Sequence, residues 1–244
     1  RYINEEGDEL LRLDSDGERI WRVSEEKLQN KKDRYYFTEA IAVDKGELYI
    51  SNLDLNREGS PSKVEIPYKP VIRYATPIFD TNDKRRGVII ANVFANSFLK
   101  DLGLESNIIK TEEHVAEKEY LIDKDGSYFV HPAKKKEWGG LNDLNTGENF
   151  TKDFPEISQD ALSGNASAKN INGLAVSYAP VFFDENNKER FWVVLDTVSE
   201  DVVFGDVKSL RNTILVFGFL ILLFVVLLAL IISRSIAKPI LALQ

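Results

Sequence analysis

The residues best suited to chemistry in this sequence are a guanidinium and the aromatic rings that follow it. Arg34 is followed directly by Tyr35, Tyr36 and Phe37. A guanidinium presents parallel N–H donors that match the two oxygens of a carboxylate, and neighbouring rings supply apolar walls. This combination predicts a binding site for a small organic anion.

Residues farther along the chain could complete such a site. Ser51, Asp54 and Arg73 interrupt apolar, strand-like segments, where a buried charge needs a partner. We include Tyr49 in the candidate site, although Tyr35, Tyr36 and Tyr49 also suit a core. An alternative stays open, in which charged residues pair with one another and fix the long loop of residues 56–67. Those residues are Arg12, Arg34, Asp54, Glu58 and Arg73.

Enzymatic signatures are absent from the sequence. There is no phosphate-binding loop, no nucleophile elbow and no His-Glu-x-x-His motif. The chain has no cysteine and two histidines, His114 and His131, for which a solvated helix face and a packing role are sufficient explanations. Two Asp-x-Asp-Gly turns lack the further oxygen ligands of a calcium loop. We therefore expect no catalytic residue, no metal and no cofactor.

The segments around these residues are typical of antiparallel strands that occur twice. Residues 9–13 and 19–23 flank one Asp-Gly turn, and residues 120–122 and 128–130 flank another. Residues 71–80 and 87–93 form a longer pair around a polar turn, as do residues 175–184 and 191–196. The repetition predicts two antiparallel α+β modules in tandem.

Short helices are expected between the strands. Residues 33–42 have a helical pattern, and residues 154–162 have another with Pro155 in the first turn, where its missing N–H costs little. Residues 102–118 are the expected link between modules. The loops of residues 56–67 and 134–146 are long for a compact domain, which makes them candidate binding loops.

The C-terminal part of the sequence predicts a membrane-spanning helix. Residues 213–232 contain no charge, and a helix of about 20 residues spans about 30 Å, the thickness of a bilayer's hydrocarbon core. Ser199 could cap this helix, with Glu200 and Asp201 in its first turn. We expect one uninterrupted helix over residues 199–237, with Gly205 as its weak point.

Charge alone does not orient the span. Lys208 and Arg211 precede it, and Arg234 and Lys238 follow it. The preceding region carries a net charge of −10, which argues against nucleic acid and anionic lipid as partners, so we place it outside the membrane. Because the chain has no methionine, we expect that it comes from a longer protein with an upstream export signal, most simply a first membrane helix.

Many segments of the chain match one known pattern. In the first half they are residues 1–4, 7–12, 28–37, 46–58, 69–73, 75–77 and 86–88, and in the second half residues 120–123 and 130–132. Together they resemble the double Cache sensor domains, two PAS-like modules in tandem outside the membrane. These occur in bacterial and archaeal sensor histidine kinases, chemoreceptors and diguanylate cyclases. After the span, residues 233–240 and Leu243 resemble the start of a HAMP domain, a dimeric cytoplasmic adaptor.

The resemblance implies an α+β fold of two tandem Cache modules with antiparallel sheets, followed by one long helix that continues into the membrane. The expected divisions are a membrane-distal module (1–104), a linker (105–119), a membrane-proximal module (120–198), a signalling helix (199–232, spanning at 213–232) and a HAMP start (233–244). Residues 1–211 would be extracytoplasmic and residues 234–244 cytoplasmic, in the cell membrane of a bacterium or archaeon.

The resemblance also bears on the ligand. Related sensors for amino acids have an Arg-x-Trp-Tyr-x-x-Ala pattern, followed much later by an Asp that holds the ligand's ammonium. Here Arg34 and Ala40 fit the pattern, Tyr36 and Phe37 replace the aromatic pair, and Asn92 stands roughly where the Asp would be. Asn92 lacks that charge, which argues against an amino-acid ligand.

We therefore expect extracytoplasmic small-molecule sensing by a homodimer, most simply as the sensor part of a two-component histidine kinase whose HAMP and output domains lie in the cytoplasm. A chemoreceptor or a diguanylate cyclase is the alternative among receptors. A membrane-anchored adhesion or binding protein is the alternative from another class, and it would not need a HAMP start.

Overall fold

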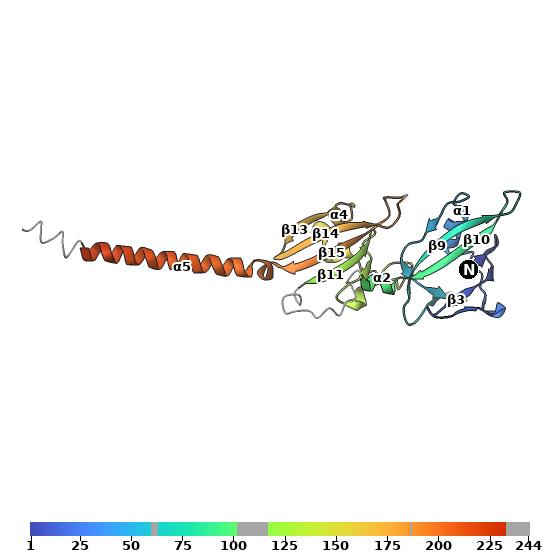
Figure 1. The fold of residues 1–244 in the computed structure, drawn as a ribbon, viewed down its shortest axis with the longest axis horizontal. Helices are drawn as coiled ribbons and strands as arrows, with labels where there is room; N and C mark the ends of the chain where they lie inside the picture. The colour runs from blue at the N-terminus through green and yellow to red at the C-terminus, as the bar shows by residue number, and fades with distance from the viewer. Residues whose placement is uncertain (60–62, 102–116, 186, 233–244) are drawn as a thin grey trace, which may run out of the picture.

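The computed structural model describes residues 1–59, 63–101, 117–185 and 187–232. In these residues the chain forms two antiparallel sheets, one after the other along the molecule, and then a single long helix (Figure 1). The predicted α+β class, with antiparallel sheets and a long C-terminal helix, is confirmed.

The first sheet contains six strands. Across the sheet they are β2 (Glu9–Leu11), β1 (Tyr2–Ile3), β10 (Arg85–Phe94), β9 (Pro70–Phe79) and β5 (Tyr49–Ile50), and β6 (Asp54–Leu55) also pairs with β9. The predicted hairpin of residues 71–80 and 87–93 is confirmed as β9 and β10. Val71, Arg73 and Ala75 of β9 are buried on one face of the sheet, because alternate side chains of a strand share a face, and Ile72 is buried on the other face in a separate apolar cluster.

Two small hairpins accompany this sheet. They are β3 (Leu13–Ser15) with β4 (Ile20–Arg22), and β7 (Arg57–Glu58) with β8 (Lys63–Val64). The predicted pairing of residues 9–13 with 19–23 was therefore right for β3 and β4 but wrong for residues 9–11. Those residues pair with β1 instead, which brings buried Glu9 into the main sheet.

Three short helical segments lie in the same part of the chain. They are the 3₁₀ turn η1 (Glu25–Lys27), α1 (Tyr35–Ala42) and α2 (Asn96–Asp101). The predicted helix of residues 33–42 corresponds to α1, which buries Tyr36, Phe37 and Ala40. Positions i, i+1 and i+4 share one face of a helix, and this face packs against Tyr49, Ala75 and other residues of the sheet.

The second sheet contains five strands. Across the sheet they are β12 (Tyr128–Val130), β11 (Lys118–Asp123), β15 (Phe191–Ser199), β14 (Leu174–Phe182) and β13 (Ser167–Ile171). Its helical segments are the 3₁₀ turn η3 (Lys134–Lys136), α3 (Phe150–Asp153) and α4 (Pro155–Ala161). The predicted hairpins of this half, and the predicted helix near residues 154–162, are confirmed by β11–β12, β14–β15 and α4.

An apolar cluster joins the two parts of the molecule. It contains buried residues that flank the first sheet together with residues from the second. From the first part come Leu53, Leu55, Ile72, Ala95 and Leu99, and from the second come Leu121, Phe129, Val130, Trp138 and Trp192. Because one continuous core spans both sheets, a displacement of one part must be accommodated by packing in the other.

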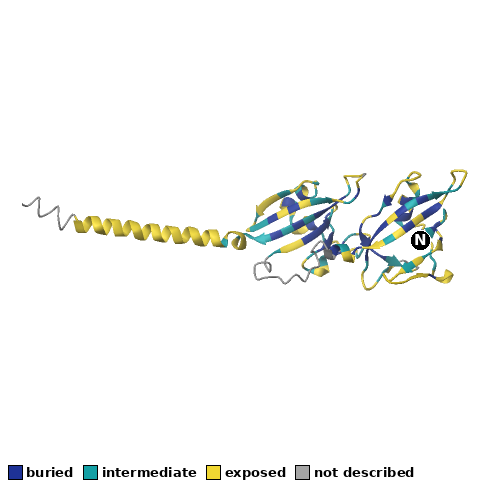
Figure 2. Cartoon of the chain, viewed as in Figure 1, coloured by how far each residue is buried: buried dark blue, intermediate teal, exposed yellow. Residues whose placement is uncertain are grey.

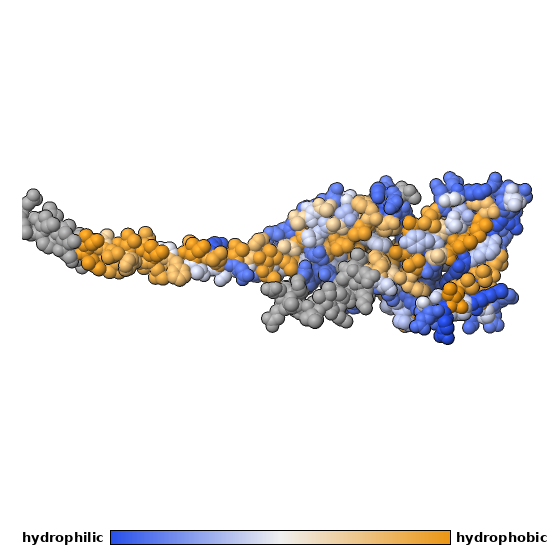
Figure 3. Space-filling model, viewed as in Figure 1, coloured by the Kyte–Doolittle hydropathy of each residue, from blue (hydrophilic) through white to orange (hydrophobic). Residues whose placement is uncertain are grey.

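The long helix α5 (Glu200–Ile232) follows β15 without a loop. Ser199 Oγ accepts a hydrogen bond from the N–H of Asp201 at 3.3 Å, as the predicted cap requires. The helix is exposed along its length, and its C-terminal half has an apolar surface (Figures 2 and 3). It is long and apolar enough to cross a membrane. The predicted HAMP start and residues 105–116 of the predicted linker lie outside the described residues.

Candidate ligand-binding site

A buried ion pair lies at the centre of the candidate site. Arg73 on β9 donates from Nη1 to Oδ1 of Asp54 on β6 at 2.6 Å, and the two side chains are 1% and 6% exposed. Oδ2 of the same carboxylate accepts a hydrogen bond from the Tyr35 hydroxyl at 2.5 Å. The carboxylate therefore links the sheet to the first residue of α1.

One aromatic ring faces two guanidinium groups. The guanidinium carbon of Arg73 lies 4.3 Å from the centroid of the Tyr36 ring, and that of Arg34 lies 5.5 Å from it. Both distances are within the range of a cation–π interaction. Arg34 occupies the N-cap position of α1, so the helix start positions its side chain beside the buried pair.

The charges of this site affect its proton equilibria. Burial alone would lower the pKa of Arg73, but the charge and hydrogen bond of Asp54, together with Tyr35 and Tyr36, outweigh burial, and the pKa of Arg73 is raised. Burial and the neighbouring Asp54 carboxylate raise the pKa of Tyr35. Arg73 is therefore charged and Tyr35 neutral throughout the physiological pH range.

A polar atom of the buried ion pair is left without a hydrogen-bond partner. Among the described residues, Nε of Arg73 is buried and has no hydrogen-bond partner. A buried donor without an acceptor costs free energy comparable to a lost hydrogen bond. Such an atom fits a place where a ligand oxygen binds.

The other predicted residues surround this pair in different roles. Ser51 holds the backbone of Arg73, because its Oγ accepts from the Arg73 N–H and its own N–H donates to the Arg73 carbonyl, both at 2.8 Å. Asn92 is half-buried directly opposite Arg73 in the sheet. Tyr49 donates to Glu39 at 2.6 Å, and Phe37 packs in the apolar core beneath α1.

The structure also shows pairing among the charged residues. Glu58 accepts hydrogen bonds from Arg1, Arg12 and Lys31 at 2.5, 3.1 and 3.2 Å. Burial alone would raise the pKa of Glu58, but the nearby cations hold it at about 2. The alternative in which the charged residues pair with one another is thus confirmed for two pairs, Arg12 with Glu58 and Arg73 with Asp54. Pairing and ligand binding do not exclude each other, because each guanidinium has five N–H donors.

Sequence reasoning missed the contribution of Tyr35. The sequence placed it beside Arg34 and Tyr36, but no local pattern showed that its hydroxyl would reach a carboxylate 19 residues away. The helix turns Tyr36 toward the core and Tyr35 toward Asp54, which only the completed fold shows.

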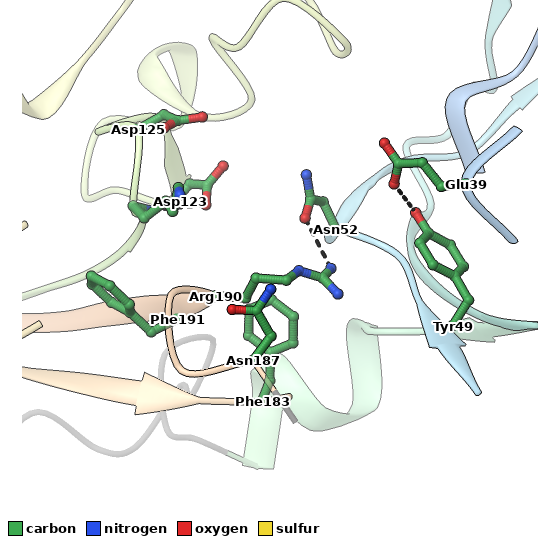
Figure 4. A pocket seen from close by; sticks show the side chains of 10 residues that line it. Glu39, Tyr49, Asn52, Asp123, Asp125, Phe183, Asn187, Arg190 and Phe191 are labelled. Atoms are coloured by element: carbon green, nitrogen blue, oxygen red, sulfur yellow. Dashed lines mark hydrogen bonds between the residues drawn. The ribbon is translucent and has the colours of Figure 1, made fainter. Parts of the chain in front are cut away.

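Two cavities lie between the two parts of the molecule, and the second includes Asp54 of the pair in its lining. One, of about 430 Å³, is lined by Glu39, Tyr49 and Asn52 on one side and by Asp123, Asp125 and Arg190 among others on the opposite side (Figure 4). Arg190 donates from Nη2 to Oδ1 of Asn52 at 3.1 Å across it. A second cavity, of about 350 Å³, is lined by Tyr35, Asp54 and Asp143 among other residues. Among the described residues, no group of three or more His, Asp or Glu side chains is arranged to hold a metal.

The described residues thus form two sheets in tandem, a polar site beside the helix of the first, and a long apolar helix after the second. The family model for bacterial histidine kinase sensor domains matches residues 1–178. The chain belongs to this family, and the predicted Cache-like sensor fold is confirmed.

Solved structures show the same fold. A domain of a sensory box/GGDEF family protein from Vibrio parahaemolyticus has 21% identity and a TM-score of 0.66, covering 82% of this chain and 71% of that one. The extracellular domain of the histidine kinase vpHK1S-Z8 has 19% identity and a TM-score of 0.64, covering 85% and 70%. The periplasmic sensory domain of the Campylobacter jejuni chemoreceptor Tlp1 has 18% identity and a TM-score of 0.54, covering 78% and 62%. A comparison with curated protein sequences gave no match.

Proposed function

We propose that this chain is the sensor region of a membrane-bound histidine kinase and that its distal module binds a small organic anion. The predicted distal module, residues 1–104, contains the Arg73–Asp54 pair and the Tyr36 ring. Arg34 and Arg73 would bind the ligand's carboxylate, Tyr36 and Tyr49 would form apolar walls, and Asn92 would contact a polar group of the ligand.

The observation that carries this proposal is the unpartnered Nε of buried Arg73. The Nη1 atom of this guanidinium already binds Asp54, so a ligand could accept from Nε without breaking the pair. A ligand carboxylate within reach of Nε would supply the missing acceptor in a dry environment, where a charge-assisted hydrogen bond is strong.

The position of Arg34 supports the same proposal. Ser, Thr, Asp and Asn are preferred at the N-cap of a helix, and a positive charge there opposes the helix dipole. Arg34 occupies this position in α1, and no side-chain hydrogen bond caps the helix. A residue that breaks a local rule is expected at a functional site rather than at a structural one.

Ligand binding must favour one arrangement of the molecule over another to produce a signal. The continuous apolar cluster between the sheets provides a path for this change. The direct connection of β15 to α5 then carries it toward the membrane. We propose that α5 moves against its counterpart in a homodimer and continues into a HAMP domain on the cytoplasmic side.

A thermal-shift screen tests the ligand assignment. The chain in lipid nanodiscs would be heated with a panel of small carboxylates, among them acetate, lactate, succinate and citrate, and with the L-amino acids. Arg34→Ala should abolish stabilisation by any carboxylate that raises the wild-type midpoint. Arg19→Ala is the matched control, because Arg19 lies in the same module with its side chain 83% exposed. Equal ligand stabilisation of wild type and Arg34→Ala would refute the assignment.

The kinase output rests on the family match, since the fold alone is shared with a chemoreceptor and a GGDEF protein. Fusion of this chain to a histidine kinase core that lacks its own sensor tests it. Autophosphorylation that responds to the carboxylate identified in the screen supports a kinase output. A fused core that does not respond, although the sensor binds the carboxylate, contradicts it.

A further inference from the structure

A single short segment contacts both the candidate site and the second sheet. Asp54 holds Arg73 and Tyr35 through its carboxylate. The next residue, Leu55, donates its backbone N–H to Oδ1 of Asp143 at 2.7 Å, across 88 positions of sequence. Because adjacent residues share a rigid peptide plane, a displacement of Asp54 is transmitted directly to the Leu55 N–H.

The loop that receives this hydrogen bond is bound to the same segment a second time. Arg57 donates from Nη1 to the carbonyl oxygens of Asn142 and Asp143, at 2.9 and 3.2 Å. Leu55 thus contacts the loop through its backbone N–H and Arg57 through its side chain, while the Asp54 side chain contacts Arg73 and Tyr35 in the site. The side chain of Leu55 is fully buried in the apolar cluster that joins the sheets.

The loop around Asp143 is itself fixed to the second sheet. The N–H of Leu144 donates to the carbonyl of Trp138 at 3.0 Å, and the N–H of Asn145 donates to the carbonyl of Gly140 at 3.0 Å. Trp138 is held to β12, because its N–H donates to the carbonyl of Tyr128 at 2.7 Å and its buried ring lies tilted beside that of Phe129, with centroids 5.3 Å apart. Movement of the loop is therefore coupled to movement of β12 rather than absorbed by the loop.

The Asp143 carboxylate lies among charges from both parts of the molecule. Asp54 and Arg57 face it from the first part, and Asp123 faces it from β11. Burial, followed by the repulsion of Asp54 and Asp123, raises the pKa of Asp143 to about 7, against the opposing effects of the Leu55 N–H and Arg57. The charge of Asp143 therefore changes within the physiological pH range, and the folded structure favours the protonated form over the ionised form despite the Leu55 hydrogen bond.

We propose that Asp143 is the positioning residue of a pH-sensitive joint, through which the state of the distal site reaches the second sheet. Only the role of the distal module as the ligand-binding module rests on the proposed function. The joint itself is defined by contacts between Leu55, Arg57 and the loop of residues 139–148. Above about pH 7 the Asp143 carboxyl group ionises beside Asp54 and Asp123, the joint loosens, and the two parts of the molecule become less tightly coupled.

The joint can be tested without a ligand by hydrogen exchange and mass spectrometry of the chain in nanodiscs. Tyr35→Phe removes one hydrogen bond to Asp54 and is a mild perturbation of the site. It should accelerate exchange in peptides covering residues 141–149 at least threefold. Tyr178→Phe is the matched control, because it removes a similar hydroxyl–carboxylate bond, to Asp160, away from the joint.

The effect of Tyr35→Phe on the loop should disappear when Asp143→Ala is added. Loop exchange that does not respond to Tyr35→Phe, or that responds equally in the Asp143→Ala background, overturns the proposal. Because no ligand is present, either result is independent of whether Arg34 binds an anion.

A pH series keeps the proposal testable if Asp143→Ala fails to fold. After correction for intrinsic chemistry, exchange of the Leu55 amide in the wild type should be at least threefold faster at pH 8 than at pH 5.5, because ionisation of Asp143 favours opening. Asp143→Asn retains an acceptor oxygen but cannot ionise, so this difference should vanish in that variant. An identical pH dependence in wild type and Asp143→Asn overturns the joint as proposed.

Discussion

The two sheets use the space beneath their helices in different ways. Beneath α1, the first sheet places the charged pair Arg73–Asp54 and the hydroxyl of Tyr35. Beneath α3 and α4, the second sheet packs a cluster dominated by rings and aliphatic side chains, with Tyr128 and Phe150 fully buried. The same layers therefore enclose a polar site in one module and a packed core in the other.

This difference indicates a division of labour between the modules. A buried ion pair contributes little net stability, because desolvation offsets its attraction, so its retention fits recognition better than folding. A filled aromatic core resists deformation and transmits displacement. We interpret the distal module as the receptor of the ligand and the proximal module as the part that carries movement to α5.

The largest predicted effect comes from breaking the polar pair. Asp54→Ala leaves the Arg73 charge buried without its partner and should lower the free energy of unfolding by about 4 kcal/mol. Replacement of both residues, as Asp54→Leu with Arg73→Met, should restore most of that loss but abolish ligand stabilisation. Urea denaturation of the three proteins measures the effect. A double variant no more stable than Asp54→Ala would contradict this interpretation of the pair.

The proximal core should respond as an apolar core does. Phe150 is fully buried against Tyr128 and Phe154. Phe150→Ala should lower the free energy of unfolding by about 3 kcal/mol, through lost burial and a residual cavity. The control Phe182→Ala, at a ring 44% exposed, should lower it by less than about 1 kcal/mol. Similar losses in both variants would show that this module is not a tightly packed transmitter.

The joint between the modules should make stability depend on pH. The pKa of Asp143 is raised by burial to about 7, and that of Asp123 to about 6, from an ordinary value of 3.8. The folded chain therefore binds more protons than the unfolded chain between about pH 4 and 7, and its stability falls as pH rises through that range. Asp143→Asn removes the larger contribution and should flatten the dependence.

For that variant, the thermal midpoint at pH 8 should rise relative to wild type, because the neutral amide replaces a half-buried charge. The rise should be only a few degrees, because solvent screens that charge. At pH 5, where Asp143 is already protonated, the two proteins should melt at similar temperatures. A midpoint difference that is the same at both pH values would contradict the predicted direction of the pH dependence.

The smallest predicted effect separates stability from function at Arg34. Arg34→Ser places a preferred capping residue at the start of α1 and removes a positive charge from the helix N-terminus. The free energy of unfolding should rise by about 0.5 kcal/mol, while carboxylate stabilisation is lost. Asn149→Ala makes the reverse change, the loss of a capping residue, because Asn149 caps α3 by accepting from the Thr151 N–H at 2.9 Å. It should lower stability by about 1 kcal/mol.

Much of the fold could be predicted because its signals are local. The β9–β10 and β14–β15 hairpins each have alternating or continuous apolar strands and one polar turn. The α5 helix has an uninterrupted apolar run and the Ser199 cap. The pairing of residues 9–11 with β1 was missed, because strand partners distant along the chain leave no local pattern.

The candidate site was only partly predictable for the same reason. Arg73 and Asp54 could be identified because a charge in an apolar strand needs a partner. The sequence does not show that Asp54 would bind both Arg73 and Tyr35, because the contact with Tyr35 depends on the packing of α1 on the sheet. The contact of Asp143 with Leu55 joins loops from different modules and could not be seen in either loop alone.

The most direct test of this division of labour is hydrogen-exchange mapping of the wild-type chain with the carboxylate found by the thermal-shift screen. We predict that protection increases first in peptides covering residues 34–37, 51–55 and 71–75, around the Arg73–Asp54 pair. Smaller changes should extend through residues 139–148. New protection confined to α3, α4 and the strands beneath them would place the ligand in the proximal module and contradict the account.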